Sequence, residues 1–162
     1  MQAGKILVAK HHGTFVIKLV GDVRLTLCTT IDDYFDEIFS SPDFTGVVID
    51  LSGAEGIDST SLGLLAKLAI QAKKRYQLIP IIVSPNPCIT RLLDSMGFDK
   101  VFAIRDEIEQ VALGTLGELP VKGADEDCVR SKIIEAHRVL MELNEKNRQT
   151  FSSLVSTLET SS

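Results

Sequence analysis

Short apolar blocks separated by polar turns run through residues 5–104 and predict alternating strands and helices. The first two blocks flank His11-His12-Gly13, which is typical of a β-hairpin. Further strands are predicted at 47–51, 79–83 and 101–104, and helices at about 30–39, 59–75, 87–96 and 106–113. Strands that alternate with helices indicate a mostly parallel sheet, and the hairpin implies one antiparallel edge. The pattern therefore predicts an α/β fold with the order ββαβαβαβα.

Residues with strong local preferences mark the ends of these helices. Thr30 or Asp32 can cap the first helix, and Pro42 ends it because the residue before a proline avoids the α region. Pro87 suits the first position of the third helix, and Gly97 follows its end.

The pattern changes after residue 113. Four helix-breaking residues predict a linker over 114–125: Gly114, Gly117, Pro120 and Gly123. Residues 126–158 contain no Gly or Pro, and eight of nine positions spaced three or four apart are apolar: 129, 133, 136, 140, 143, 147, 151, 154 and 158. This spacing predicts one long amphipathic helix of roughly 50 Å. The chain thus divides into a domain at 1–113, the linker, the helix at 126–158 and a disordered tail at 159–162.

The apolar stripe of the long helix needs a surface to pack against. That surface can be the α/β domain itself, a second copy of the chain through self-association, or another protein. Asn147 is the polar member of the stripe and would fix the register if the helix pairs with another. The sequence leaves these alternatives open.

Composition narrows the classes of function. The 162 residues are 44% hydrophobic and carry a net charge of -5, which argues against a nucleic-acid-binding protein. The sequence has neither a transmembrane segment nor a signal-peptide core, so a cytoplasmic protein without membrane contact is expected. Cys28, Cys88 and Cys128 form no metal or disulfide pattern and are expected to be reduced thiols. No cofactor is expected.

The segment from residue 46 to 65 carries the candidate chemistry. A buried strand at 47–51 leads through a glycine-containing turn to Asp58, Ser59, Thr60 and Ser61, and a helix follows. Three hydroxyls are therefore predicted at a helix start, exposed at the end of a strand. A helix N-terminus has unpaired N–H groups and positive dipole character, so it tolerates a phosphate group.

Several roles compete for these hydroxyls. One of them can simply cap the helix. A hydrolase nucleophile is disfavoured because the segment lacks Gly-x-Ser-x-Gly, and His11, His12 and His137 offer no obvious base, although distance in sequence does not settle distance in space. Nucleotide-binding glycine motifs are absent. Asp50 ends a buried strand, but the acidic pair that a phospho-accepting receiver domain needs is missing after the first strand. A non-enzymatic binding module switched by phosphorylation needs only an exposed hydroxyl and a docking surface.

Three segments together carry a family resemblance. Val-Val-Ile-Asp-Leu-Ser at 47–52, Asp-Ser-Thr-Ser-Leu-Gly at 58–63 and the stretch at 92–102 resemble the STAS domain of bacterial anti-anti-sigma factors, also called anti-sigma factor antagonists. The resemblance covers roughly residues 5–113. Within the family, the loop and the long C-terminal helix are most similar to the anti-anti-sigma factor of the HptB phosphorelay, which controls motility and biofilm formation. The helix itself departs from the common pattern of the family.

The resemblance implies a partner switch. The serine after the loop aspartate, here Ser59, would be phosphorylated by an anti-sigma kinase and restored by a PP2C-type phosphatase, and the unphosphorylated form would bind the anti-sigma factor. This chain has Thr60 and Ser61 where the family usually has Ser and Gly, so both are alternative phosphorylation sites. The expected docking surface comprises Asp58, Ser59, Thr60, Ser61, Leu62, Gly63 and Lys67.

A second hypothesis is a structural adaptor. In that case the α/β domain is a fixed docking block, the C-terminal helix recruits a partner, and Ser59 is only a helix cap.

Overall fold

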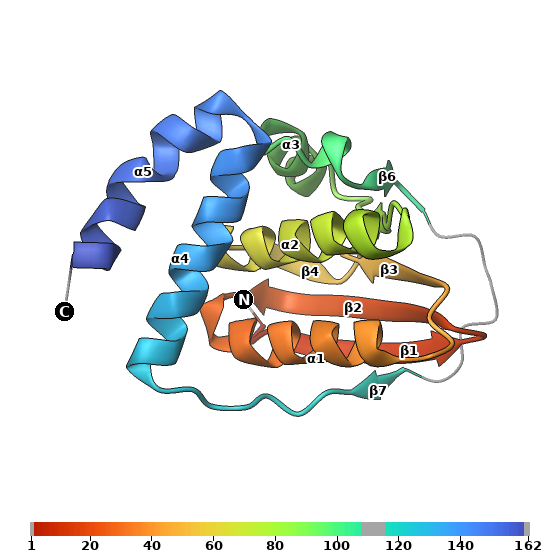
Figure 1. Ribbon diagram of the computed structural model, residues 1–162. Helices are drawn as coiled ribbons and strands as arrows, with labels where there is room; N and C mark the ends of the chain where they lie inside the picture. Colours follow the sequence, from red (N-terminus) through yellow and green to blue (C-terminus); the bar gives the residue numbers. More distant parts are fainter. Residues whose placement is uncertain (1, 108–115, 161–162) are drawn as a thin grey trace.

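The computed structural model describes residues 2–107 and 116–160, and its centre is a seven-stranded sheet in the order β6-β5-β3-β2-β1-β7 (Figure 1), with β4 paired separately to β2. The strands are β1 Lys5–His11, β2 Thr14–Val23, β3 Gly46–Asp50, β4 Ala54–Ile57, β5 Ile81–Val83, β6 Ala103–Arg105 and β7 Gly117–Glu118. β1 is antiparallel to β2 and β7, whereas the pairs β2–β3, β2–β4, β3–β5 and β5–β6 are parallel. The predicted hairpin and mostly parallel α/β sheet are confirmed.

Two helices, α1 Cys28–Ser40 and α2 Ser59–Tyr76, lie over one face of this sheet, as Figure 1 shows. The 3-10 turn η1 Leu25–Leu27 leads directly into α1, so the helix begins at Cys28. The predicted caps Thr30 and Asp32 therefore lie inside the helix, where both are buried. The third helix, α3 Pro87–Ser95, begins at the expected proline and is followed by η2 Phe98–Lys100.

The hydrophobic core lies between the sheet and these helices. The central strands contribute fully buried aliphatic side chains such as Ile17, Leu19 and Ile49, each at most 1% exposed. From the helices, Phe35 and Leu65 pack into the same cluster. A parallel strand that is covered by helices reads as a continuous apolar run, which is why the strand at 47–51 was visible in the sequence.

The C-terminal amphipathic helix is present, and the structure divides it at Asn144 into α4 Glu126–Leu143 and α5 Glu145–Thr160. Asn144 is extended (φ -160, ψ 166), and its side-chain oxygen accepts a hydrogen bond from the Asn147 N–H at 2.7 Å. An asparagine in this position caps a new helix, so the chain turns here. The tail predicted to be disordered from residue 159 is helical up to Thr160, and the last two residues lie outside the described range.

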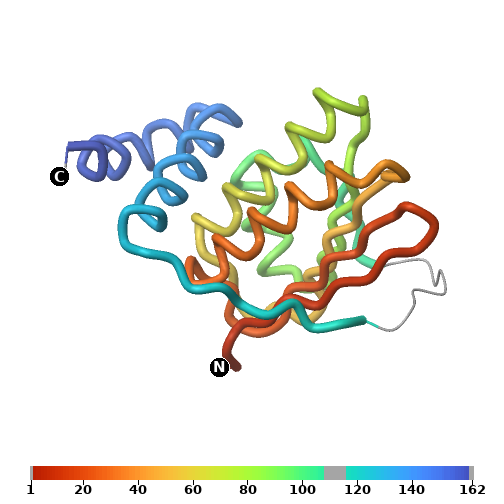
Figure 2. Tube along the Cα trace, turned by 60° about the horizontal axis from the view of Figure 1, so that its bottom comes forward, coloured from red at the N-terminus to blue at the C-terminus, as the bar shows by residue number. Residues whose placement is uncertain are grey.

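The structure decides where the apolar stripe packs: it folds back on its own domain. α4 crosses the N-terminal ends of α1 and α2, and α5 lies beyond α4, away from the β1–β2 turn (Figures 1 and 2). Ala136 and Leu140 are fully buried in the common core. Asn147 is buried too, and its amide donates to the carbonyls of Met96 and Leu140 at 2.8 Å. The polar position of the stripe therefore fixes how α5 sits on this chain.

The predicted linker carries more structure than its composition suggested. β7 pairs with β1, the Leu119 N–H donates to Ile6, and the Lys122 N–H donates to the Thr30 hydroxyl at 2.7 Å. The segment thus runs along the sheet edge and α1 before α4 begins. Of the helix predicted at 106–113, residues 106–107 form a bend, and the remainder lies outside the described residues. In residues 2–107 and 116–160, none of the helices is both long and apolar enough to span a bilayer.

Candidate functional site

Asp58 builds the start of α2. Its Oδ1 accepts a hydrogen bond from the Ser61 N–H at 2.8 Å, and its Oδ2 accepts one from the Leu25 N–H at 2.7 Å. The first bond caps the helix, and the second ties the loop to η1. The Asp58 N–H also donates to the Val23 carbonyl. Ser59, as the first residue of α2, is therefore held in a fixed position.

The three hydroxyls of this loop lie in different surroundings, contrary to the expectation that all are exposed. Thr60 is 4% exposed and Ser61 is completely buried. Among residues 2–107 and 116–160, the Ser61 hydroxyl finds no hydrogen-bond partner. Ser59 is only partly buried. Helical periodicity explains the difference, because the second and third residues of α2 turn toward the sheet while the first stays at the rim.

Ser59 has a partner from far along the chain. Its Oγ lies 2.7 Å from Nε2 of His137, which belongs to α4 and is 2% exposed. The other ring nitrogen, Nδ1, lies 2.7 Å from the Ile133 carbonyl oxygen. A carbonyl only accepts, so Nδ1 carries the proton, and in the neutral ring Nε2 accepts the hydrogen of the serine. Phe151 of α5 packs edge-on against the same imidazole, with ring centroids 4.9 Å apart.

Gly63 lets α4 approach α2 very closely. A methyl carbon at this position would lie 2.6 Å from the Cβ of Ala136 and closer still to the Ala136 carbonyl oxygen. The two helix backbones therefore touch, and only glycine fits at the crossing. The pattern Ser-Leu-Gly inside a helical run was the one sequence signal of such a contact, since a glycine within a helix often marks a packing constraint.

A network of charges flanks this crossing. Asp32 of α1 is 3% exposed and accepts hydrogen bonds from Lys67 of α2, at 3.0 Å, and from Lys132 of α4. Lys67 also pairs with Glu135 of α4 at 2.8 Å. Four side chains thus join three helices, and Lys67, which lies along the predicted docking surface, is bound within the chain.

The network shifts the pKa values of Asp32, Lys67 and Lys132. Burial opposes ionisation of Asp32, but the hydrogen bonds from Lys132 and Lys67 outweigh it, so the pKa of the carboxyl lies below its ordinary value. Burial likewise opposes the charged forms of both lysines, and their carboxylate partners outweigh it, so the pKa values of Lys67 and Lys132 are raised. All of these groups are therefore charged at neutral pH.

The residues predicted for partner docking do lie together, on the first two turns of α2 and just before them, but they do not form an open surface. Leu62 is 1% exposed and Gly63 is buried, while Ser59 and Lys67 are engaged by α4. The sequence placed these residues at one helix start and gave no sign that α4 covers them. His137 is 78 residues away from Ser59, and no local pattern links the two.

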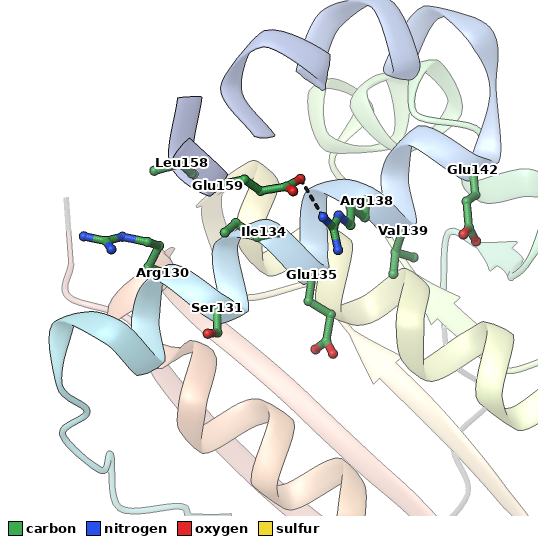
Figure 3. A pocket seen from close by; sticks show the side chains of 9 residues that line it. All are labelled: Arg130, Ser131, Ile134, Glu135, Arg138, Val139, Glu142, Leu158 and Glu159. Atoms are coloured by element: carbon green, nitrogen blue, oxygen red, sulfur yellow. Dashed lines mark ion pairs between the residues drawn. The ribbon is translucent and has the colours of Figure 1, made fainter. Parts of the chain in front are cut away.

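An open groove of about 640 Å³ separates α4 from α5 (Figure 3). Five of its nine lining residues are charged, three are apolar and one is a serine, and Arg138 and Glu159 form an ion pair across it. A groove of similar size lies beside α3 and includes Ser84, Thr90 and Arg105. Neither groove is lined by Ser59. In the described part of the chain, no cluster of three or more His, Cys, Asp or Glu side chains is arranged to hold a metal ion.

The arrangement of strands and the loop before α2 agree with a comparison of family models. The model of the STAS domain matches residues 5–111. The chain belongs to the STAS family. The match ends before α4 and α5, so α4, which covers the Ser59 loop, and α5 both lie outside the matched residues.

Similar proteins carry the name that the sequence resemblance suggested. The anti-sigma-F factor antagonist RsfB of Mycobacterium tuberculosis is 27% identical over 113 residues, which are 69% of this chain and 89% of RsfB. An anti-sigma factor antagonist from Mycobacterium paratuberculosis has a similar crystal structure, with a TM-score of 0.55 at 24% identity, covering 65% of this chain and 88% of that one. Unphosphorylated SpoIIAA, also an anti-sigma factor antagonist, aligns with a TM-score of 0.54 at 18% identity, covering 67% and 93%. These structural likenesses show the shared fold.

Proposed function

We propose that this protein is an anti-sigma factor antagonist that works as a phosphorylation-controlled partner switch. In its unphosphorylated form it binds an anti-sigma factor or an equivalent regulator, and phosphorylation of Ser59 releases that partner. The observation that carries the proposal is the position of Ser59: it follows the capping Asp58 at the N-terminus of α2 in a STAS domain, and its neighbours Thr60 and Ser61 are buried. The name of the relative RsfB supports the same function.

The local structure suits a reversible charge. A kinase would transfer the γ-phosphoryl group of ATP to Ser59 Oγ, releasing ADP and the hydroxyl proton. The product carries about -1.5 to -2 charges and three further acceptor oxygens. Near the N-terminus of α2 the helix dipole stabilises this charge, so the domain itself stays folded. At a docking surface, a penalty of about 3 kcal/mol would weaken partner binding by roughly two orders of magnitude.

Three further parts belong to the same proposal. A partner kinase and a PP2C-type phosphatase act on Ser59, the protein works in the cytoplasm, and its pathway controls motility and biofilm formation. The protein itself is not an enzyme in this proposal. The pair of Ser59 and His137 has the geometry of a nucleophile and a base, but a hydrolase would also need space for a substrate at the serine. In the structure Phe151 and the backbone of α4 occupy the surroundings of this pair.

Paired baits test the proposal. Ser59→Ala should capture the anti-sigma factor from a lysate of the source cells, and Ser59→Asp should capture at least about tenfold less. Ser52 provides a matched control, because it is an exposed serine at the end of β3, and neither Ser52→Ala nor Ser52→Asp should change capture. Equal capture by both Ser59 variants would refute the switch.

The groove between α4 and α5 favours the alternative of a structural adaptor that recruits its partner through the C-terminal helices (Figure 3). In that case Ser59 only starts a helix and carries no phosphate. Mass spectrometry of phosphopeptides from growing cells distinguishes the two, since a phosphorylated Ser59 supports the switch and its consistent absence supports the adaptor.

A further inference from the structure

The contact between Ser59 and α4 leaves no space for a phosphate group. The serine oxygen and Nε2 of His137 are 2.7 Å apart, which is a direct hydrogen bond with nothing between them. A phosphoryl group would place a phosphorus atom and three oxygens on that serine oxygen. The imidazole cannot move aside while α4 stays in place. It is 2% exposed, is held by the Ile133 carbonyl and packs against Phe151.

The helix that carries His137 cannot adjust locally either. Four residues further along α2, the backbone of α4 already touches Gly63 so closely that even a methyl group would overlap it. On the other side of the crossing, Asp32 and Glu135 fix α4 through Lys67 and Lys132. With the Ser59 side chain directed at His137, a phosphate is therefore accommodated only if α4 as a whole moves away from α2.

We propose that α4 is an intramolecular occupant of the docking surface on α2, and that phosphorylation of Ser59 displaces α4 together with α5. This inference rests on the proposed phosphorylation of Ser59, and it adds α4 to the switch beside Ser59 and the partner protein. The surface that a partner needs, Ser59 to Lys67, is covered by a segment of the same chain. A partner that binds there competes with α4, and such a partner would present an amphipathic helix with a small residue opposite Gly63.

The charges at the site allow the opposite outcome, in which phosphorylation binds α4 more tightly. The test must distinguish this outcome from displacement. A phosphate held by the His137 ring or by Lys132 would bind α4 more tightly. The geometry opposes this outcome, because the 2.7 Å between the Ser59 oxygen and Nε2 has no room for a phosphorus atom and three oxygens, and Lys132 is already paired with Asp32. Displacement and tighter binding predict opposite changes in the hydrogen exchange of α4.

The experiment installs phosphoserine at position 59 of the full-length chain during translation, so that no kinase is needed. Hydrogen exchange of peptides from residues 126–160 should be at least about tenfold faster than in the unmodified protein, while β1, β2 and β3 keep their protection. Phosphoserine at position 52, which is exposed on the same domain, is the matched control and should leave α4 unchanged. Unchanged or slower exchange of α4, faster exchange of the sheet as well, or an equal effect at position 52 would each overturn the proposal.

A second variant tests the same contact without adding charge. Gly63→Ala inserts one methyl group against Ala136 and should accelerate exchange of α4 and α5 in the unphosphorylated protein. Gly117→Ala is the control, because a Cβ at that glycine meets no atom within 4 Å. Protection of α4 equal to that of the unmodified protein would contradict the close approach on which the proposal depends.

These measurements do not depend on the proposed function being correct. If cells never phosphorylate Ser59, the partner switch fails, yet the installed phosphoserine still shows whether α4 and a phosphate exclude each other. If α4 stays docked over phosphoserine, the displacement fails while the paired baits can still show a switch.

Discussion

At the scale of single residues, Asp32 has the most consequential surroundings. It is nearly inaccessible to solvent, and two lysines from different helices neutralise it. A buried carboxylate of this kind stabilises the protein only while both its partners and its own charge are present. The contacts of α4 therefore depend on one side chain that lies on α1, outside the Ser59 loop.

Replacing that carboxylate tests its role. Asp32→Asn removes the carboxylate shared by Lys67 and Lys132, leaving Lys67 with Glu135 alone, and should lower the free energy of unfolding by about 3 kcal/mol at neutral pH. The neighbouring Asp33 is the control, since it is half-exposed and pairs with Lys122 at 3.5 Å, so Asp33→Asn should cost less than about 0.5 kcal/mol. Urea unfolding measures both values. A cost for Asp32→Asn as small as that for Asp33→Asn would show that the network contributes nothing.

The same group gives a pH dependence. The pKa of Asp32 is lowered in the folded protein, so its stabilisation is complete above the ordinary carboxyl pKa of 3.8 and is lost as the pH falls through the folded value. The raised pKa values of Lys67 and Lys132 act in the opposite sense, with stabilisation lost as the pH rises above 10.5. The stability difference between the unmodified protein and Asp32→Asn should therefore be constant from pH 5 to 9 and shrink below about pH 4. A difference that does not shrink at all as the pH falls below 3.8 would contradict this account.

At the scale of elements, the break between α4 and α5 depends on Asn144. Its side chain caps α5 and also donates to the Ser95 carbonyl at 3.3 Å, and Lys100 donates to the last carbonyl of α4 at 2.6 Å. Gly97 allows this approach, because its positive φ of 85° forms the turn against which Asn144 packs. The corner is thus determined by polar groups, although apolar positions of the stripe lie on both sides of it.

A change of the cap should loosen this corner. Asn144→Ala removes the acceptor for the Asn147 N–H and should lower the free energy of unfolding by about 1 kcal/mol. Asn144→Asp keeps the acceptor and should cost clearly less. Thermal unfolding followed by circular dichroism compares the two, and equal losses would show that the cap is not what positions α5.

The elements also show what a sequence reveals and why. The strands at 46–50 and 81–83 were predictable because each lies in an apolar run bounded by turn residues. β4 and β7 were not, since Ala54–Ile57 and Gly117–Glu118 are short and pair through backbone groups that any residue provides. Ser59 was recognisable from its neighbours in the chain, whereas its contact with His137 is set by the crossing of two helices. The spacing of apolar residues predicted which face of α4 is buried, but it did not predict that α2 is the surface against which this face packs.

At the scale of the whole molecule, Ser59 lies where the family domain contacts the helices that follow it. Residues 5–111 form the family domain, and the relatives named above are covered over 88–93% of their own lengths, so a domain of this type is sufficient as a fold. α4 and α5 are added to it, and Ala136, Leu140 and Leu143 extend its core. The addition covers the part of the domain that carries the candidate chemistry, as the proposed displacement of α4 requires.

Removal of the added helices tests this view of the molecule. A chain that ends after Lys122 keeps β7 and the hydrogen bond to Thr30, so the domain should still unfold cooperatively. It loses the burial that α4 provides, and its free energy of unfolding should fall by roughly 2–4 kcal/mol. A chain that ends after Leu143 keeps α4 and the His137 contact and should lose less. Calorimetry distinguishes the outcomes. Loss of the cooperative transition in the shorter chain would mean that α4 completes the core. Unchanged stability would mean that α4 contributes little to packing on the domain and could not cover Ser59.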